Sequence, residues 1–305
     1  MQTDVLITDV GPRDGLQNQS RILSPAQRIA LIEQLIAAGV RSIEAGAMVS
    51  PKAVPAMAGS DEVIASIATR YPVQLQALVP NVKGYQLAVQ AGAKAVLFVI
   101  CASQSMNQKN VRLSVEDSLL QLQQILQLAT QDQVEVLTCI AVAWHCPFEG
   151  KTPVATVSQL VTQLQRLGAS QLVLADTIGA ANPASVRHLL QVIVQQQDAA
   201  LLGCHFHDTR AMGLANAAAA VDVGIRRFDA AIGGLGGCPF APGATGNVAT
   251  EDLVMMLEQM GLRTGIDLAA LCQVGTFAGE LTGQCTGGRA DRWRQLQLAA
   301  QQPLY

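Results

Sequence analysis

Short apolar segments alternate with amphipathic ones along the chain, and this alternation most limits how the chain can fold. The apolar segments are typical of buried β-strands and occupy residues 5–10, 41–45, 73–79, 95–100, 134–142, 171–175, 201–207 and 227–232. Segments with helical periodicity follow them, at residues 25–38, 60–70, 82–91, 115–131, 156–167, 183–196, 211–223 and 248–260. Glycines stand where four of these helices are expected to end: Gly39, Gly92, Gly168 and Gly224.

Eight strands that are each followed by a helix predict a parallel sheet, and repeating units of about 30 residues favour a closed (β/α)8 TIM barrel. The competing architecture is an open, doubly wound sheet. The turn after the first strand, Gly-Pro-Arg-Asp-Gly at 11–15, argues against it because the G-x-G-x-x-G pattern of dinucleotide-binding folds is missing. We expect one TIM-barrel domain over residues 1–305, with the barrel at about 3–262 and additional C-terminal helices at about 263–305.

Composition argues against two classes of partner. The net charge is −3 and the longest basic run is Arg226-Arg227, so we expect no nucleic-acid binding. The longest apolar run, residues 95–102, is far shorter than the roughly 20 residues that span a bilayer, so we expect no membrane partner. The N-terminal residues do not resemble a signal peptide, which favours a cytoplasmic protein. Seven irregularly spaced cysteines predict free thiols rather than a disulfide framework.

Polar side chains follow the predicted strands at their C-terminal ends, where the active sites of such barrels lie. His205 and His207 flank Phe206 in a strand, so both imidazoles point the same way and can bind one divalent ion. Taken alone, this pair fits two structural histidines equally well. Further candidate ligands and titratable residues follow other strands. A set of one carboxylate, two imidazoles and one amide oxygen suits Mg²⁺ or Mn²⁺. These candidates are Asp14, Glu44, Asp176 and Asn247.

Five stretches resemble, in order, the signatures of 3-hydroxy-3-methylglutaryl-CoA lyases. They are TDVGPRDGLQN at 8–18, VSPK with VPAM at 49–57, VPNVKG at 79–84, DTIG at 176–179, and GLGGCPFA through GNVATED at 234–252. The resemblance implies a metal-dependent TIM barrel that cleaves an acyl-CoA to acetyl-CoA and acetoacetate by a retro-Claisen step. It also implies a place in leucine degradation and ketone-body formation.

The resemblance further implies a role for each matching residue. The metal ligands would be Asp14, His205, His207 and Asn247. Arg13 would neutralise the thioester oxygen as it becomes an enolate, because a guanidinium keeps its proton. Glu44 and Asp176 would act around the metal and the substrate hydroxyl, or would only orient neighbouring groups. Cys238 would exchange a proton with the enolate, or would be an inert small residue of its loop. Substrate binding is assigned to Arg13, Gln17 and Arg210.

Departures from the family pattern leave the acyl group open. Arg210 stands where a tyrosine is usual, and a cation there can pair with a carboxylate of the substrate or of Asp208. Apolar residues replace hydroxyl side chains after Glu44 and before Asp176. These changes favour a larger, less polar acyl-CoA or another branched one such as citramalyl-CoA. A condensing synthase of the same superfamily is less expected because those enzymes carry a long region after the barrel. A homodimer or tetramer is the expected assembly.

Overall fold

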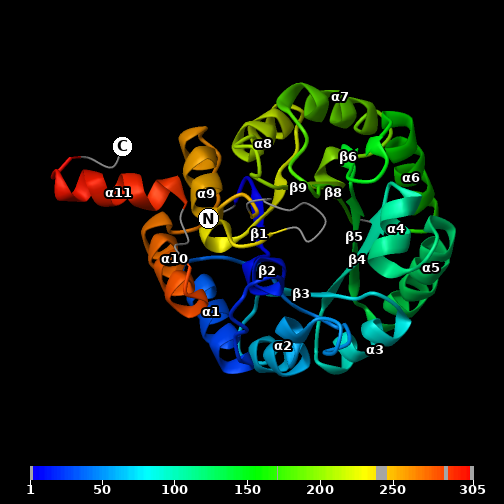
Figure 1. Ribbon diagram of the computed structural model, residues 1–305, viewed down its shortest axis with the longest axis horizontal. Coiled ribbons are helices and arrows are strands. Elements are labelled where there is room, and N and C mark those ends of the chain that lie inside the picture. The colour runs from blue at the N-terminus through cyan, green and yellow to red at the C-terminus, as the bar shows by residue number, and fades with distance from the viewer. Residues whose placement is uncertain (1–2, 170, 238–245, 285–287, 303–305) are drawn as a thin grey trace.

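Eight parallel strands close into a barrel (Figure 1). The computed structural model describes residues 3–169, 171–237, 246–284 and 288–302. Around the barrel the strands follow the order β1, β10, β9, β8, β5, β4, β3, β2 and back to β1. Their bounds are Leu6–Asp9 (β1), Ser42–Ala47 (β2), Gln74–Leu78 (β3), Ala95–Cys101 (β4), Glu135–Ala141 (β5), Gln171–Asp176 (β8), Leu202–Phe206 (β9) and Arg227–Ala230 (β10).

A ring of helices covers the outside of the barrel (Figure 1). They are α1 (Pro25–Ala37), α2 (Ser60–Ala68), α3 (Val82–Gln90), α5 (Val115–Asp132), α6 (Val154–Arg166), α7 (Pro183–Ile193), α8 (Gly213–Asp222) and α9 (Thr250–Gln259). Apolar side chains between this ring and the strands form the main core. The (β/α)8 barrel predicted from the sequence is therefore confirmed.

Several elements are added to this plan. A π-helix, η1 (Gly11–Gly15), follows β1, and a helix, α4 (Gln104–Val111), follows β4. A short hairpin of β6 (His145–Cys146) and β7 (Gly150–Lys151) follows β5. Among the described residues, three 3₁₀ turns complete the connections: η2 (Pro55–Met57), η3 (Ala199–Leu201) and η4 (Ile232–Gly234). The sequence predicted none of these, and the first two lie at the mouth of the barrel.

In the part of the chain that the structure describes, two helices follow the barrel. The first, α10 (Leu268–Thr282), packs against α1, and the second, α11 (Arg289–Ala299), extends away from the ring (Figure 1). The carboxylate of Asp252 in α9 accepts hydrogen bonds from the backbone N–H groups of Arg289 (2.9 Å) and Ala290 (2.7 Å). The start of α11 is therefore held by a side chain from the last barrel helix.

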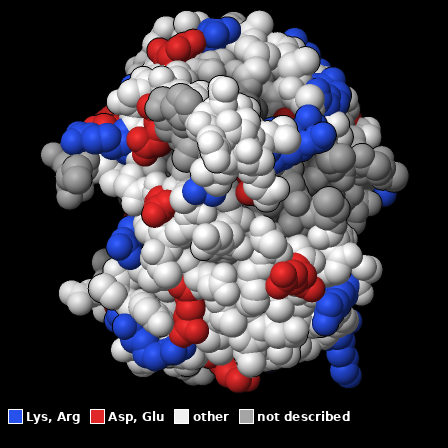
Figure 2. Space-filling model, turned by 90° about the vertical axis from the view of Figure 1, so that its left-hand side faces the viewer, with Lys and Arg blue, Asp and Glu red and all other residues white. Residues whose placement is uncertain are grey.

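Charged side chains of both signs are mixed on one face of the molecule (Figure 2). On the face drawn in Figure 2, Lys and Arg are interspersed with Asp and Glu and form no large patch of one charge. Within the described ranges, no helix is both long and apolar enough to cross a membrane. The five cysteines in these ranges are buried free thiols.

Candidate metal centre

The π-helix η1 carries Arg13 and Asp14 into the mouth of the barrel. It begins directly after β1, where the carboxylate of Asp9 accepts hydrogen bonds from the backbone N–H of Gly11 (2.9 Å) and the hydroxyl of Thr250 (2.7 Å). A Cβ atom on Gly11 would lie 2.7 Å from Asp9 Oδ1, so only glycine allows this close turn. The tight turn fixes where the two following charged residues point.

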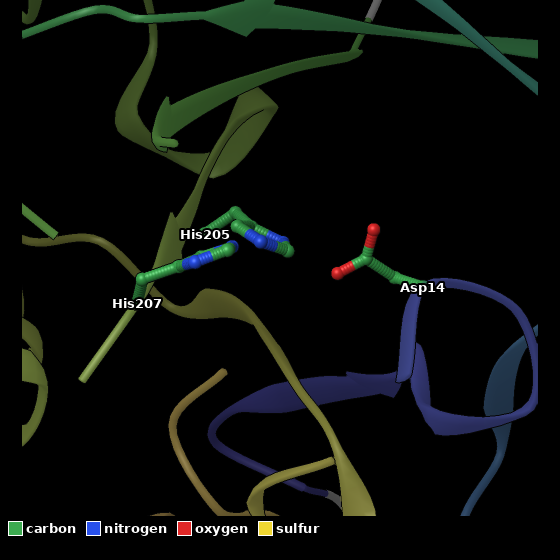
Figure 3. Close-up of side chains that lie close together, drawn as sticks. All are labelled: Asp14, His205 and His207. Atoms are coloured by element: carbon green, nitrogen blue, oxygen red, sulfur yellow. The ribbon is translucent and has the colours of Figure 1, made fainter. Parts of the chain in front are cut away.

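Asp14 faces the two histidines across the barrel mouth (Figure 3). His205 lies in β9 and His207 directly after it, with ring centroids 5.2 Å apart. One ligand atom from each of Asp14, His205 and His207 lies within 4.8 Å of the other two. This spacing suits three side chains that share one divalent ion.

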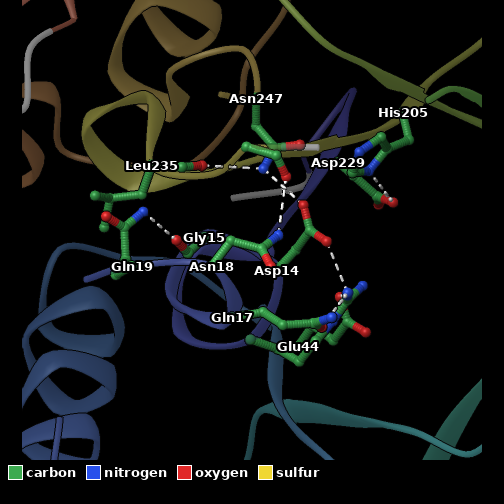
Figure 4. Close-up of polar contacts among 12 residues, drawn as sticks. Asp14, Gly15, Gln17, Asn18, Gln19, Glu44, His205, Asp229, Leu235 and Asn247 are labelled. Atoms are coloured by element: carbon green, nitrogen blue, oxygen red, sulfur yellow. Dashed lines mark hydrogen bonds and ion pairs between the residues drawn. The ribbon is translucent and has the colours of Figure 1, made fainter. Parts of the chain in front are cut away.

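Two buried polar atoms next to this cluster have no hydrogen-bond partner within the described residues, Asn247 Oδ1 and His207 Nδ1. The amide nitrogen of Asn247 is fully used, since it donates to Asp14 Oδ2 (2.8 Å) and to the carbonyl oxygen of Leu235 (3.0 Å) (Figure 4). Burying an acceptor without a partner costs about 1–3 kcal/mol. A cation held by Asp14, His205 and His207 would give the amide oxygen of Asn247 a partner, so the residues present fit a metal ion.

The surroundings of Asp14 and His207 keep these two side chains in the form that binds metal. Burial alone would raise the pKa of Asp14, but Arg13 and the two imidazoles lower it to about 2. Burial lowers the pKa of His207 to about 4, and the neighbouring His205 adds to this effect. At neutral pH the cluster therefore offers an ionised carboxylate and a neutral imidazole, which are the ligating forms.

Asp229 orients His205. Its carboxylate Oδ2 lies 3.3 Å from Nδ1 of His205 (Figure 4), which leaves Nε2 of the same ring free for a metal. Burial lowers the pKa of His205, but Asp229 and Asp14 together outweigh burial and the net shift is upward. Sequence reasoning missed this residue. The signal was present, because a carboxylate in the middle of a strand that enters a barrel core needs a polar partner.

Arg13 is held by two carboxylates. Its Nη1 donates to Asp14 Oδ1 at 2.7 Å and its Nη2 to Glu44 Oε2 at 2.6 Å, while Gln17 Oε1 lies 3.5 Å from Nη1. Burial raises the pKa of Glu44, and the Arg13 guanidinium opposes that rise. A planar guanidinium matched to two carboxylates has little freedom to turn, so its charge is fixed beside the metal ligands.

The structure thus brings seven of the predicted site residues together: Arg13, Asp14, Gln17, Glu44, His205, His207 and Asn247. Asp176 and Arg210 instead bind the loop after β8. The carboxylate of Asp176 accepts from the backbone N–H groups of Ala180 (2.8 Å) and Ala181 (3.0 Å). The exposed Arg210 donates to the carbonyl oxygens of Gly179 (2.8 Å) and Ala181 (3.3 Å). Their assigned roles stay predictions, and Cys238 lies outside the described residues.

A cavity of about 340 Å³ opens beside the cluster. Its polar side carries Arg13, Asp14, His205, His207 and Asp229, which come from η1, β9, β10 and the residue after β9. The opposite side is almost entirely apolar and comes from β3, β4, β5, β8 and α4. Its residues are Leu78, Val79, Pro80, Leu97, Val99, Met106, Val111, Cys139, Ala141 and Ala175. We call this second side the apolar wall.

A family model described as HMGL-like matches residues 4–277. The chain belongs to the HMGL-like family. An HMGL-like relative from Pseudomonas aeruginosa, named 3-hydroxy-3-isohexenylglutaryl-CoA/hydroxymethylglutaryl-CoA lyase, is 41% identical over 94% of this chain and 95% of its own. The (R)-citramalyl-CoA lyase of Chloroflexus aurantiacus is 43% identical over 88% of this chain and 87% of its own.

The fold comparison agrees. The structure of an HMG-CoA lyase from Acinetobacter baumannii in complex with coenzyme A and 3-methylmalate has a TM-score of 0.90 and 41% identity, over 94% of each chain. HMGL-like relatives named for different acyl groups are thus almost equally similar to this chain. Overall sequence identity therefore does not distinguish between these acyl groups.

Proposed function

We propose that this protein is a divalent-metal-dependent carbon–carbon lyase that cleaves a 3-hydroxy-3-methylglutaryl-CoA-like thioester to acetyl-CoA and acetoacetate. The observation that carries the proposal is the unpartnered amide oxygen of Asn247, buried beside Asp14, His205 and His207. The Arg13 guanidinium, which is fixed next to these groups, supplies the positive charge that the enolate requires. The names of the HMGL-like relatives support the same activity.

The reaction breaks the bond between C2 and C3 of the substrate. The C3 hydroxyl loses its proton and C3 becomes a ketone, while the bonding electron pair moves onto the thioester as an enolate. Bound at Asp14, His205, His207 and Asn247, a divalent ion supplies a Lewis acid that lowers the pKa of the substrate hydroxyl. Arg13 faces the same cavity and stabilises the negative charge of the enolate oxygen.

The remaining residues position these groups and handle protons. Glu44 holds the Arg13 guanidinium from the side opposite Asp14, and Gln17 lies beside it. We assign to Cys238 the return of a proton to C2, which converts the enolate to acetyl-CoA. Asp176 and Arg210 shape the loop after β8 and through it the same cavity.

The proposal extends to the setting of the enzyme. We infer Mg²⁺ or Mn²⁺ as the ion, since both accept mixed oxygen and nitrogen ligands. An acyl-CoA is the expected partner, and a homodimer or tetramer in the cytoplasm the expected form. Leucine degradation and ketone-body formation are the processes in which this cleavage occurs.

The test is cleavage of 3-hydroxy-3-methylglutaryl-CoA by purified protein. The protein is first treated with a chelator, and acetyl-CoA and acetoacetate are then followed before and after addition of Mg²⁺ or Mn²⁺. We expect turnover only with metal. Citramalyl-CoA in a parallel assay, with release of pyruvate followed, covers the alternative substrate. Absence of turnover with metal demonstrably bound would overturn the proposed substrate, and metal-independent turnover would overturn the proposed mechanism.

A further inference from the structure

The cavity beside the metal centre reaches through two layers of side chains. Residues two apart on a strand point to the same side, and both members of such pairs line it. The pairs are Leu97 and Val99 on β4, Cys139 and Ala141 on β5, and Ala175 and Thr177 at the end of β8. The interior of a TIM barrel is normally filled by side chains, so a cavity of this depth requires an explanation.

Small side chains create this depth. Cys139 and Ala175 belong to a cluster of buried apolar side chains inside the barrel that also contains the larger Leu97, Leu137 and Val173. Ala141 forms the upper layer on β5. Its position is fixed by Val142, which has a left-handed backbone (φ 52°) and donates its N–H to the Thr177 hydroxyl oxygen at 2.8 Å. A β-branched residue rarely adopts this conformation, so the backbone directly after Ala141 is strained.

The apolar wall provides no charged partner. Among the described residues that line the cavity, Arg13 is the only lysine or arginine, and both of its terminal nitrogens already bind carboxylates. Within the described part of the chain, the polar side chains on the far side of the cavity are Asn110 and Thr177. A carboxylate placed against the wall would lose its hydration without compensation, whereas an alkyl group would gain from burial.

Helix α4 closes the far side of the space. Its Met106 is 2% exposed and Val111 is half-buried, and both line the cavity. Methionine is unbranched and adapts to ligands of different shape. The far end of the cavity can therefore follow a flexible apolar chain.

We propose that the apolar wall binds the substituent on C3 of the substrate and accepts an apolar branch longer than methyl. The substrate class is thus 3-hydroxy-3-alkylglutaryl-CoA thioesters. Ala141 and Ala175 determine how long a branch is accepted. The inference rests on the proposed lyase function and adds the acyl group to it. Cleavage gives acetyl-CoA and a 3-oxo acid that keeps the branch, with the same bond broken and the same proton moved.

The experiment compares two substrates that differ only in this branch. Purified enzyme with Mn²⁺ is assayed on 3-hydroxy-3-methylglutaryl-CoA and on 3-hydroxy-3-butylglutaryl-CoA, with acetyl-CoA followed in both assays. Each buried methylene adds binding free energy, so we expect kcat/KM for the butyl compound to exceed that for the methyl compound by at least about tenfold.

Filling the cavity should reverse this preference. Ala141→Leu, and independently Val99→Phe on a different strand, should lower the butyl-to-methyl ratio of kcat/KM by about tenfold or more. Activity on the methyl compound should fall less than activity on the butyl compound, because a methyl branch takes up less of the filled space. Ala65→Leu adds the same side chain to an exposed position of α2 and should leave both substrates unchanged.

The outcomes separate the inference from the proposed function. Good turnover of the methyl compound with a lower kcat/KM for the butyl compound would overturn the inference and leave the lyase function standing. Failure to cleave either compound would overturn the lyase function. Equal effects of both filling variants on the two substrates would show that the apolar wall does not hold the branch.

Discussion

At the scale of single residues, Asn247 shows how hydrogen bonds can hold a candidate metal ligand in one orientation. Its nitrogen is held by Asp14 and by the carbonyl oxygen of Leu235, so its oxygen has one orientation. An aspartate here would place a second carboxylate against Asp14 and an oxygen against a carbonyl. The amide thus suits a site that already has one ionised carboxylate.

Removal of this amide should weaken metal binding. Asn247→Ala deletes a ligand and also frees Asp14, so the dissociation constant for Mn²⁺ should rise by about 10–100-fold, as measured by titration calorimetry. His205→Ala should abolish both metal retention and turnover. His188→Ala, an exposed histidine of α7, is the matched control. Unchanged Mn²⁺ affinity in Asn247→Ala would contradict its role as a ligand.

Arg13→Lys should separate catalysis from metal binding. A lysine cannot pair with Asp14 and Glu44 together in the way the guanidinium does, so charge stabilisation of the enolate should be lost. We expect kcat to fall by about 10²–10³-fold, while the dissociation constant for Mn²⁺ changes only a few-fold. Steady-state kinetics and calorimetry on the same preparation test this, and an unaltered kcat would rule out Arg13 as the group that stabilises the enolate.

The residues around this site were predictable from the sequence to different degrees. Asp14 and the two histidines follow predicted strands and match family motifs, and the structure brings them together. The partnership of Arg13 with Glu44 could not be predicted, because it joins two strand ends through a contact 31 residues apart. Asp229 was missed because attention to strand ends overlooks a charge inside a strand.

At the scale of elements, strong periodicity made the barrel helices and strands predictable to within a few residues at most ends. Helix α4 was missed because it is polar and short, although Ser103 caps it by accepting from the N–H of Met106. The π-helix η1 was taken as a turn because its sequence is rich in glycine and proline. Helix α11 has no continuous apolar face and depends on Asp252, a tertiary contact that periodicity cannot reveal.

Asp252→Ala should loosen α11 and little else. The variant removes the partners of two backbone N–H groups at the start of the helix, a change worth about 1 kcal/mol for a typical cap. Hydrogen exchange at residues 289–299 should become clearly faster, while the thermal midpoint of the barrel stays within about 2 °C. Asp291→Ala, in the first turn of α11 itself, is the comparison. Equal exchange in wild type and Asp252→Ala would show that other contacts hold the helix.

At the scale of the whole molecule, the barrel is closed where its first and last strands meet. β1 pairs with β10, and Asp9 at the end of β1 ties the start of α9 to the barrel through Thr250. Burial raises the pKa of Asp9 to about 7, although hydrogen bonds from Thr250 and Gly11 oppose the rise. Its ordinary value in an unfolded chain is about 3.9. The folded protein is therefore more stable when the Asp9 carboxyl group at this closure is protonated.

Stability should consequently fall as the pH rises from about 4 to about 7 and then level off. Each unit of pKa shift corresponds to about 1.4 kcal/mol, so Asp9 contributes a penalty on the order of 4 kcal/mol above pH 7. Asp9→Asn keeps an acceptor for Gly11 and removes the titration. Urea unfolding at pH 4.5 and pH 8 should show a smaller loss of stability in this variant than in Asp61→Asn, an exposed carboxyl of α2. Equal losses of stability in the two variants would show that ionisation of Asp9 does not destabilise the folded protein.

The two sides of the cavity also differ in where they lie along the chain. Apart from Val49 and Val54, the apolar wall and its neighbours come from one continuous stretch, residues 78–177, whereas the polar side comes from residues before 45 and after 204. A recombination that exchanges only the middle third of the gene between two relatives would thus transfer the acyl preference and keep every metal ligand. The residues proposed to bind the branch and those proposed to bind the metal thus occupy different parts of the chain.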